Sequence, residues 1–314
     1  MLIEKTRELL KEIKKTVSEN RAEQKIPGNV FFMKDGNVLC LERHKGESRF
    51  PYANDGYILW VHSTGHIHVK SGVFNVFKPV YDGNNINAEF IAGIKNADGS
   101  YFPISLTGAA KQLFEPFHVK RYLVYTLSAA YFVTETDVAD FVVRASMSST
   151  QELQFSVGCL PKTETPADVY IASYFDPFLK DGEADNMWEY RTRKCRYEGG
   201  GKFIAYRTGK KPKLGIKRAV SGAEILSSEA TAIRAGILGG ERGTLNASPA
   251  LKTGEFFKDV LLSGGAIASE MIRFKLEKEA RIDYVLPLDM QGDKIDKLLE
   301  TPVLPRTIDE EIER

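Results

Sequence analysis

The sequence is poor in cysteine, in net charge and in long apolar runs. Its three cysteines are an odd number that cannot form a closed set of disulfides, and no two of them form a CxxC pair; they are Cys40, Cys159 and Cys195. The 43 basic and 42 acidic residues leave a net charge of +1, so no overall field attracts nucleic acid or an anionic membrane. No stretch approaches about 18 uninterrupted apolar residues, and the N-terminus is charged where a signal peptide has its apolar core. We therefore expect a cytoplasmic chain that binds neither nucleic acid nor a membrane.

What the sequence has is the composition of a globular protein, with 43% hydrophobic and 11% aromatic residues. Near its start, apolar residues recur at the helical period, with Glu and Lys between them; they are Ile3, Leu10, Ile13 and Val17. The spacing predicts one amphipathic helix over residues 2–20. We expect this helix to pack on its own domain, and a helix that binds a partner is the alternative.

From Gly28 onward the apolar period changes to two, which is typical of strands. The turn 34–37 contains Asp-Gly, which tolerates the positive φ of tight turns, and predicts a hairpin between 30–33 and 38–41. The same pattern predicts further strands at 57–62, 66–70, 73–77, 86–94, 101–106, 121–127, 130–134, 140–147, 151–160, 169–174, 202–208, 214–219, 224–227 and 266–276. Long helical intervals between these strands are missing, so the sequence predicts a mainly β protein, a large antiparallel β-sandwich. Helices are expected at 293–300 and 308–314, separated by prolines.

Three histidines, His62, His66 and His68, raise the question of a metal site, since imidazole is a good zinc ligand. On a strand, His66 and His68 would point to one face, but His62 lies across a Ser-Thr-Gly turn and no nearby cysteine offers a fourth ligand. We interpret them as surface or interface histidines and expect no metal.

A glycine-rich stretch at 236–243 resembles a phosphate cradle with Arg242 nearby. It lacks the GxxxxGK[ST] sequence and does not clearly follow a strand and open a helix, so we interpret it as a mobile connection.

Four carboxylates lie close together in the sequence: Asp176, Glu183, Asp185 and Glu189. We interpret them as a solvated surface, and a general acid for glycosidic cleavage is the alternative.

The better binding candidates are Trp188, Tyr190, Arg191 and Arg193, because aromatic faces and planar guanidinium groups suit sugar rings and hydroxyls. For the two aromatic residues, packing in the core or at a subunit interface is the simpler role. With Asp176 added, these residues are our candidates for a substrate-binding or active-site rim.

Several segments occur in an order that is similar to that of a known protein family. They are the strand 141–147 with its turn 148–150 into 153–157, the passage 172–177, the segment 187–193, the run 239–243 and the run 249–251. Over residues 28–290 the chain resembles the N-terminal β-sandwich of glycoside hydrolase family 94 phosphorylases, and within that family the 1,2-β-oligoglucan phosphorylases. The resemblance implies a supersandwich of the galactose-mutarotase-like type.

The resemblance also implies an activity, the inverting phosphorolysis of a β-glucoside. Inorganic phosphate attacks the anomeric carbon while an Asp protonates the departing oxygen, which gives α-glucose 1-phosphate. In the family, that Asp and the phosphate pocket belong to an (α/α)6 barrel that follows the sandwich, so no catalytic residue is carried over to this chain. No metal or organic cofactor is implied, and inorganic phosphate is the co-substrate of the full enzyme.

The expected partners are a β-linked gluco-oligosaccharide, the downstream barrel and a second copy in a homodimer, with residues 180–193 lending a loop to the neighbouring active site. The expected domains are an N-terminal helix at 1–24, the sandwich at 25–290 and the start of a helical linker at 291–314. Alone, this part of a phosphorylase would be inactive. The alternatives are a stand-alone carbohydrate-binding or assembly module and a sandwich with its own mutarotase-like or lyase-like activity.

Overall fold

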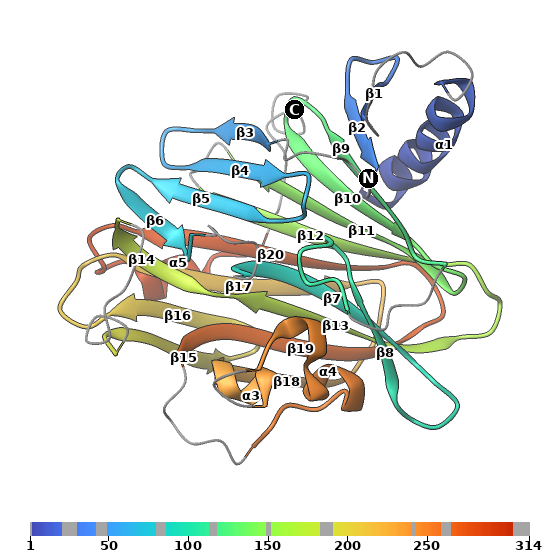
Figure 1. The fold of residues 1–314 in the computed structure, drawn as a ribbon. Helices are drawn as coiled ribbons and strands as arrows, with labels where there is room; N and C mark the ends of the chain where they lie inside the picture. Colours follow the sequence, from blue (N-terminus) through green and yellow to red (C-terminus); the bar gives the residue numbers. More distant parts are fainter. Residues whose placement is uncertain are drawn as a thin grey trace.

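The chain folds into three antiparallel β-sheets with one long N-terminal helix and several short helices packed against them (Figure 1). The computed structural model describes residues 2–20, 30–41, 49–79, 86–112, 118–148, 152–182, 191–239, 243–258 and 265–303. The largest sheet has ten strands, in the order β1 (Val30–Phe32), β2 (Val38–Leu41), β9 (Lys120–Tyr125), β10 (Ala129–Glu135), β11 (Ala139–Met147), β12 (Glu152–Pro161), β20 (Ala280–Asp289), β17 (Lys213–Ser221), β16 (Lys202–Arg207) and β15 (Arg193–Gly199).

Two five-stranded sheets complete the β structure. One has the order β18 (Ile225–Ile233), β19 (Ala266–Leu276), β13 (Ala167–Phe175), β7 (Ala88–Lys95) and β8 (Tyr101–Ser105). The other has the order β14 (Pro177–Asp181), β6 (Phe74–Phe77), β5 (Ile67–Ser71), β4 (Ile58–His62) and β3 (Arg49–Ala53). Strands β13 and β14 follow each other directly in the chain but belong to different sheets, so the passage around Asp176 joins the two.

The main core lies between the sheets because side chains alternate between the two faces of each strand. On β12, Phe155 and Val157 join the main core, whereas Gln154 and Ser156 lie on the opposite face of the strand. Phe90 of β7, Phe175 of β13 and Tyr284 of β20 meet in this core, with ring centroids 5.4 to 5.9 Å apart. Aromatic contacts across the sheets therefore hold the sandwich together.

The N-terminal helix α1 (Leu2–Asn20) packs on the outer face of the ten-stranded sheet. Leu10 and Ile13 are buried against a cluster that includes Leu39, Val124 and Val142. This confirms that residues 2–20 form an amphipathic helix that packs on its own domain.

The other helices are short. Helix α3 (Arg234–Leu238), the 3₁₀ turn η1 (Leu245–Ala247) and α4 (Pro249–Thr253) lie against the β18–β8 sheet, where Ile237 and Leu251 pack with Tyr170 and Met271. Helix α5 (Ile295–Glu300) packs on Ile204. Among the described residues, no helix is both long enough and apolar enough to cross a bilayer.

The mainly β antiparallel fold is confirmed, as are the hairpin at the 34–37 turn and the helix near 293–300. Several strands were missed, namely β3, β14, β15 and β20. The mobile connection expected at 236–243 is wrong at its start, because Gly236 is buried within α3; residues 240–242 lie outside the described residues. The helix expected at 308–314 also lies outside them.

Candidate functional site

Two of the predicted rim residues, Asp176 and Arg193, form a buried ion pair. Asp176 is 1% exposed and Arg193 is 5% exposed, so the expected solvated surface is wrong for Asp176; Glu183, Asp185 and Glu189 lie outside the described residues. The Nη2 of Arg193 donates to Asp176 Oδ1 and, at 2.9 Å, to the carbonyl oxygen of Pro177. The pair therefore ties the start of β15 to the passage between β13 and β14.

Two further arginines surround this ion pair. Arg234 Nη1 lies 3.8 Å from Asp176 Oδ2, and Arg207 Nε donates to the carbonyl oxygen of Phe178 at 2.6 Å. The guanidinium groups of Arg193 and Arg207 lie 5.8 and 5.0 Å from the centre of the Phe178 ring. Burial, with the nearby charges of Arg207 and Arg234, lowers the pKa of Arg193 to about 10, so it remains charged at neutral pH.

The remaining predicted rim residues are placed differently. Arg191 is exposed in the turn before β15, while Trp188 and Tyr190 lie outside the described residues. Arg207 and Arg234, which the sequence reasoning missed, come from β16 and α3 and carry no local signal in the sequence. A sugar-binding rim at 176–193 stays a prediction.

A second buried carboxylate, Glu89 of β7, organises the segment after β8. It is 0% exposed and its side chain accepts hydrogen bonds of 2.8 to 3.2 Å from neutral donors; these are the backbone N–H groups of Phe90, Thr107 and Ala110 and the hydroxyls of Ser105 and Thr107. Burial raises the pKa of Glu89, and these hydrogen bonds act against the rise. The carboxylate thereby fixes the backbone of the 106–112 segment.

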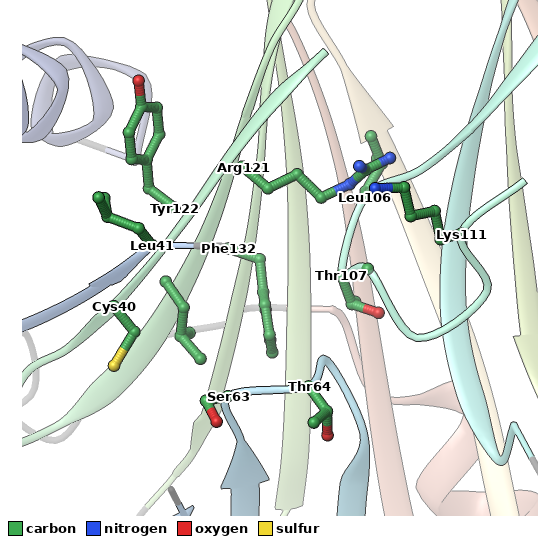
Figure 2. A pocket seen from close by; sticks show the side chains of 12 residues that line it. Cys40, Leu41, Ser63, Thr64, Leu106, Thr107, Lys111, Arg121, Tyr122 and Phe132 are labelled. Carbon is green, nitrogen blue, oxygen red and sulfur yellow. The ribbon is translucent and has the colours of Figure 1, made fainter. Parts of the chain in front are cut away.

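The first cavity beside this segment, which we call the cationic cavity, has a volume of about 290 Å³ (Figure 2). Arg121 and Lys111 extend toward one side of it in the view, while Ser63 and Thr64 come from the β4–β5 turn. Its lining is completed by Cys40, Leu41, Leu106, Thr107, Gly108, Tyr122, Leu123 and Phe132. Burial raises the pKa of the Cys40 thiol to about 11, so Cys40 is a neutral wall residue at neutral pH.

Gly65 allows the β4–β5 turn to approach the 106–112 segment closely. Its φ is +88°, and a Cβ at this position would lie 2.4 Å from the carbonyl oxygen of Thr107 and 2.5 Å from the backbone nitrogen of Ala109. Only glycine allows this approach. The two walls of the cationic cavity are therefore in direct backbone contact.

The second cavity, which we call the amide cavity, has a volume of about 230 Å³ and is lined by Asn96, Ser100, Tyr101, Phe102, Pro103, Gln112, Asn246, Ala247 and Lys252. Phe102 is 41% exposed, so its ring is accessible beside three amide side chains. Asn246 Nδ2 donates to the carbonyl oxygen of Lys111 at 2.8 Å, and Gln112 Nε2 donates to that of Leu245 at 3.0 Å. Lys111 lines one cavity and Gln112 the other, so the 106–112 segment is a wall of both.

The three histidines lie on the β4–β5 hairpin, where the backbone N–H of His62 donates to the carbonyl oxygen of His66 at 2.9 Å. The ring of His68 lies beside that of Trp60, tilted by 31° with ring centroids 5.1 Å apart, and its Nε2 lies 2.9 Å from Asn75 Oδ1. His66 is buried, with Nδ1 3.0 Å from Thr64 Oγ1, so the expectation of a surface histidine is wrong there. In the described part of the chain, no group of three or more His, Cys, Asp or Glu side chains could hold a metal ion.

No protein-family model matches the sequence, and no curated protein matches it either. Among solved structures, the chain is similar to an aldose epimerase homologue from C. elegans, at 10% identity and a TM-score of 0.45, over 78% of this chain and 99% of the other. A galactose mutarotase related enzyme from Lactobacillus acidophilus matches at 10% identity and a TM-score of 0.43, over 79% and 99%. A protein from the human microbiome described as a kojibiose phosphorylase matches at 11% identity and a TM-score of 0.36, over 83% of this chain and 28% of the other. Because each TM-score lies below 0.5, the function has to be argued from the residues of this chain.

Proposed function

We propose that this chain is the N-terminal β-sandwich of an inverting β-glucoside phosphorylase and that it holds a gluco-oligosaccharide at the amide cavity. The order of sequence segments over 28–290 supports the family. In this proposal a downstream (α/α)6 barrel supplies the catalytic Asp and the site for inorganic phosphate, so the chain alone is inactive. A homodimer in which residues 180–193 reach the neighbouring active site belongs to the same proposal.

The amide cavity carries the proposal. A neutral sugar presents apolar C–H faces and hydroxyls, which suit an aromatic ring and side chains that both donate and accept. The exposed Phe102 ring offers the first, and Asn96 and Asn246 offer the second, whereas both N–H groups of Gln112 already donate to the carbonyl oxygens of Ala110 and Leu245. Lys252 is the one charged residue among the described lining residues, and a lining with one charge fits a neutral ligand better than the two cations of the other cavity do.

Phe102→Ala tests the proposed sugar contact. We expect it to weaken the binding of β-1,2-gluco-oligosaccharides about tenfold, because ring stacking is removed while the exposed position tolerates alanine. Isothermal titration calorimetry measures the affinity. Phe32→Ala is the matched control, since Phe32 is 71% exposed on β1 of another sheet. Equal affinities for the two variants would contradict the site.

Phosphorolysis tests the assignment to an enzyme. The chain is incubated with β-1,2-gluco-oligosaccharide and phosphate, with and without a separately expressed downstream segment, and glucose 1-phosphate is assayed. Product only on supplementation supports the proposal. Product from the chain alone would place the catalytic groups within these residues, and binding with no product in either tube would favour a stand-alone carbohydrate-binding module.

A further inference from the structure

A third cavity, lined by more cationic residues than either of the other two, lies beside β14 and the turn that follows β16. It has a volume of about 480 Å³, and we call it the lysine cavity; it is lined by Phe74, Leu179, Lys180, Asp181, Thr192, Arg207, Thr208, Gly209, Lys210, Lys211, Pro212 and Met290. Four of these residues are cationic and only Asp181 is acidic. Since the whole chain has a net charge of +1, this positive charge is a local concentration.

The cationic wall is held in place before any ligand arrives. Arg207 is 3% exposed; its Nε donates to the carbonyl oxygen of Phe178 at 2.6 Å and its Nη1 to Thr192 Oγ1 at 3.2 Å. The turn after it closes with the backbone N–H of Lys210 donating to the carbonyl oxygen of Arg207 at 3.1 Å. A rigid arginine beside a closed turn loses little conformational freedom on binding.

The 289–292 turn fixes the position of Lys211. A Cβ at Gly292 would lie 2.1 Å from the carbonyl oxygen of Lys211, so the two backbones are in contact. Lys210 and Lys211 are both exposed, and neither has an ion pair within the residues that the structure describes. Like charges placed together repel each other, and an anion between them adds an attractive interaction with each cation.

The remaining lining narrows the class of anion. Two hydroxyls, from Thr192 and Thr208, stand beside the cations, and Leu179 and Met290 add apolar surface. Several cations and hydroxyls suit the three terminal oxygens of a phosphate group, and the apolar surface suits an attached organic moiety. We propose that the lysine cavity binds a phosphate monoester of a small hydroxylated molecule. This inference stands apart from sugar binding at the amide cavity.

The test is a double charge reversal with a charge-matched control. We expect α-glucose 1-phosphate to bind the wild type, and Lys210→Glu/Lys211→Glu to weaken this binding at least tenfold. Lys275→Glu/Lys278→Glu makes the same change in net charge at two other exposed positions and should bind like the wild type. Titration followed by ³¹P NMR measures the affinities of the ester and of inorganic phosphate, and isothermal titration calorimetry measures that of glucose.

The outcomes separate the ligand sources. The proposal would be overturned if the two double variants bound α-glucose 1-phosphate with equal affinity, or if glucose bound the wild type as tightly as α-glucose 1-phosphate does. Tighter binding of inorganic phosphate than of the ester would overturn the monoester assignment. If the reversal variant fails to fold, Lys210→Ala/Lys211→Ala and the salt dependence of wild-type binding give the same test: affinity must fall with added salt. Phe102→Ala should leave phosphate-ester binding unchanged, so the sugar site and the phosphate site fail independently.

Discussion

Glu89 on β7 and Asp176 in the passage between β13 and β14 are carboxylates that are buried to the same degree and stabilised in different ways. Glu89 lies opposite Tyr174 in the β7–β13 pair, and the backbone N–H of Asp176 donates to the carbonyl oxygen of Asn87 at 2.8 Å. They are 0% and 1% exposed. Glu89 is surrounded by neutral N–H and O–H donors, whereas Asp176 is paired with Arg193 and approached by Arg234.

The difference shows what each carboxylate builds. The donors to Glu89 include the backbone N–H groups of Thr107 and Ala110, so Glu89 fixes the conformation of the 106–112 segment. This segment lines both the cationic cavity and the amide cavity. The partners of Asp176 come from separate elements, β15 and α3, so its effect is to join parts of the fold that are distant in sequence. Neutral donors shape a site locally, and a buried charge pair sets the distance between elements.

The largest expected effect comes from breaking the Asp176 ion pair. Arg193→Met leaves the buried carboxylate without its main partner, and we expect the free energy of unfolding to fall by about 3–5 kcal/mol. Urea denaturation measures the change. Arg196→Met is the control, because Arg196 lies on the same strand but pairs with Glu198 at the exposed surface, where little change is expected.

Combining the change with Asp176→Asn sharpens this prediction. The double variant should lose less stability than the two single variants together, because it leaves no unpaired buried carboxylate. A loss for Arg193→Met no larger than for Arg196→Met would show that Arg234 alone can stabilise Asp176.

Glu89→Gln is expected to have a smaller effect, about 1–3 kcal/mol. The NH₂ group of Gln cannot accept a hydrogen bond, so whichever carboxylate oxygen it replaces, at least one backbone N–H among Phe90, Thr107 and Ala110 loses its acceptor. Urea denaturation measures it, with Glu277→Gln at an exposed turn as the control.

The loss of stability caused by Glu89→Gln should depend on pH. Below about pH 4.5 Glu89 is protonated in the folded and unfolded chain, and as the pH rises the unfolded chain ionises first because burial raises the pKa in the folded state. The wild type therefore loses stability from about pH 4.5 until the pH has passed the raised pKa. Gln cannot ionise, so the difference in the free energy of unfolding between the wild type and Glu89→Gln should become smaller as the pH rises across this window. A gap that widens would mean that the hydrogen bonds outweigh burial.

Local pattern was enough to predict much of the fold. The helix 2–20 and the hairpins around Asp35-Gly36 and Asp98-Gly99 follow from period and turn chemistry, which act between residues close in sequence. Strand β15 was missed because charged residues fill much of it, and β14 because it is short and begins at Pro177. The pairing of both depends on strands elsewhere in the chain.

The sites were harder to predict for the same reason. Asp176 and Arg193 were both singled out, but the sequence could not show that they bond to each other instead of facing solvent, since that depends on tertiary packing. Glu89 did leave a signal: it is the only charged residue in the apolar strand 86–94. An isolated acid in such a strand must be hydrogen-bonded or paired when buried, which marks it as a site organiser.

The smallest expected effect tests a single donor to Glu89. Thr107→Val keeps the shape of the side chain but removes the hydroxyl that donates to Glu89 Oε2 at 2.8 Å. We expect a loss of about 1.5 kcal/mol in the free energy of unfolding, and a further rise in the pKa of Glu89, because the charged form loses one of its donors. Urea denaturation across pH measures both, and Thr163→Val is the control, since its hydroxyl bonds only within an exposed loop. Thr107→Val could instead lower the free energy of unfolding without moving its pH profile. The hydroxyl would then support the backbone of the 106–112 segment without stabilising the charged form of Glu89, which would be left to the other donors.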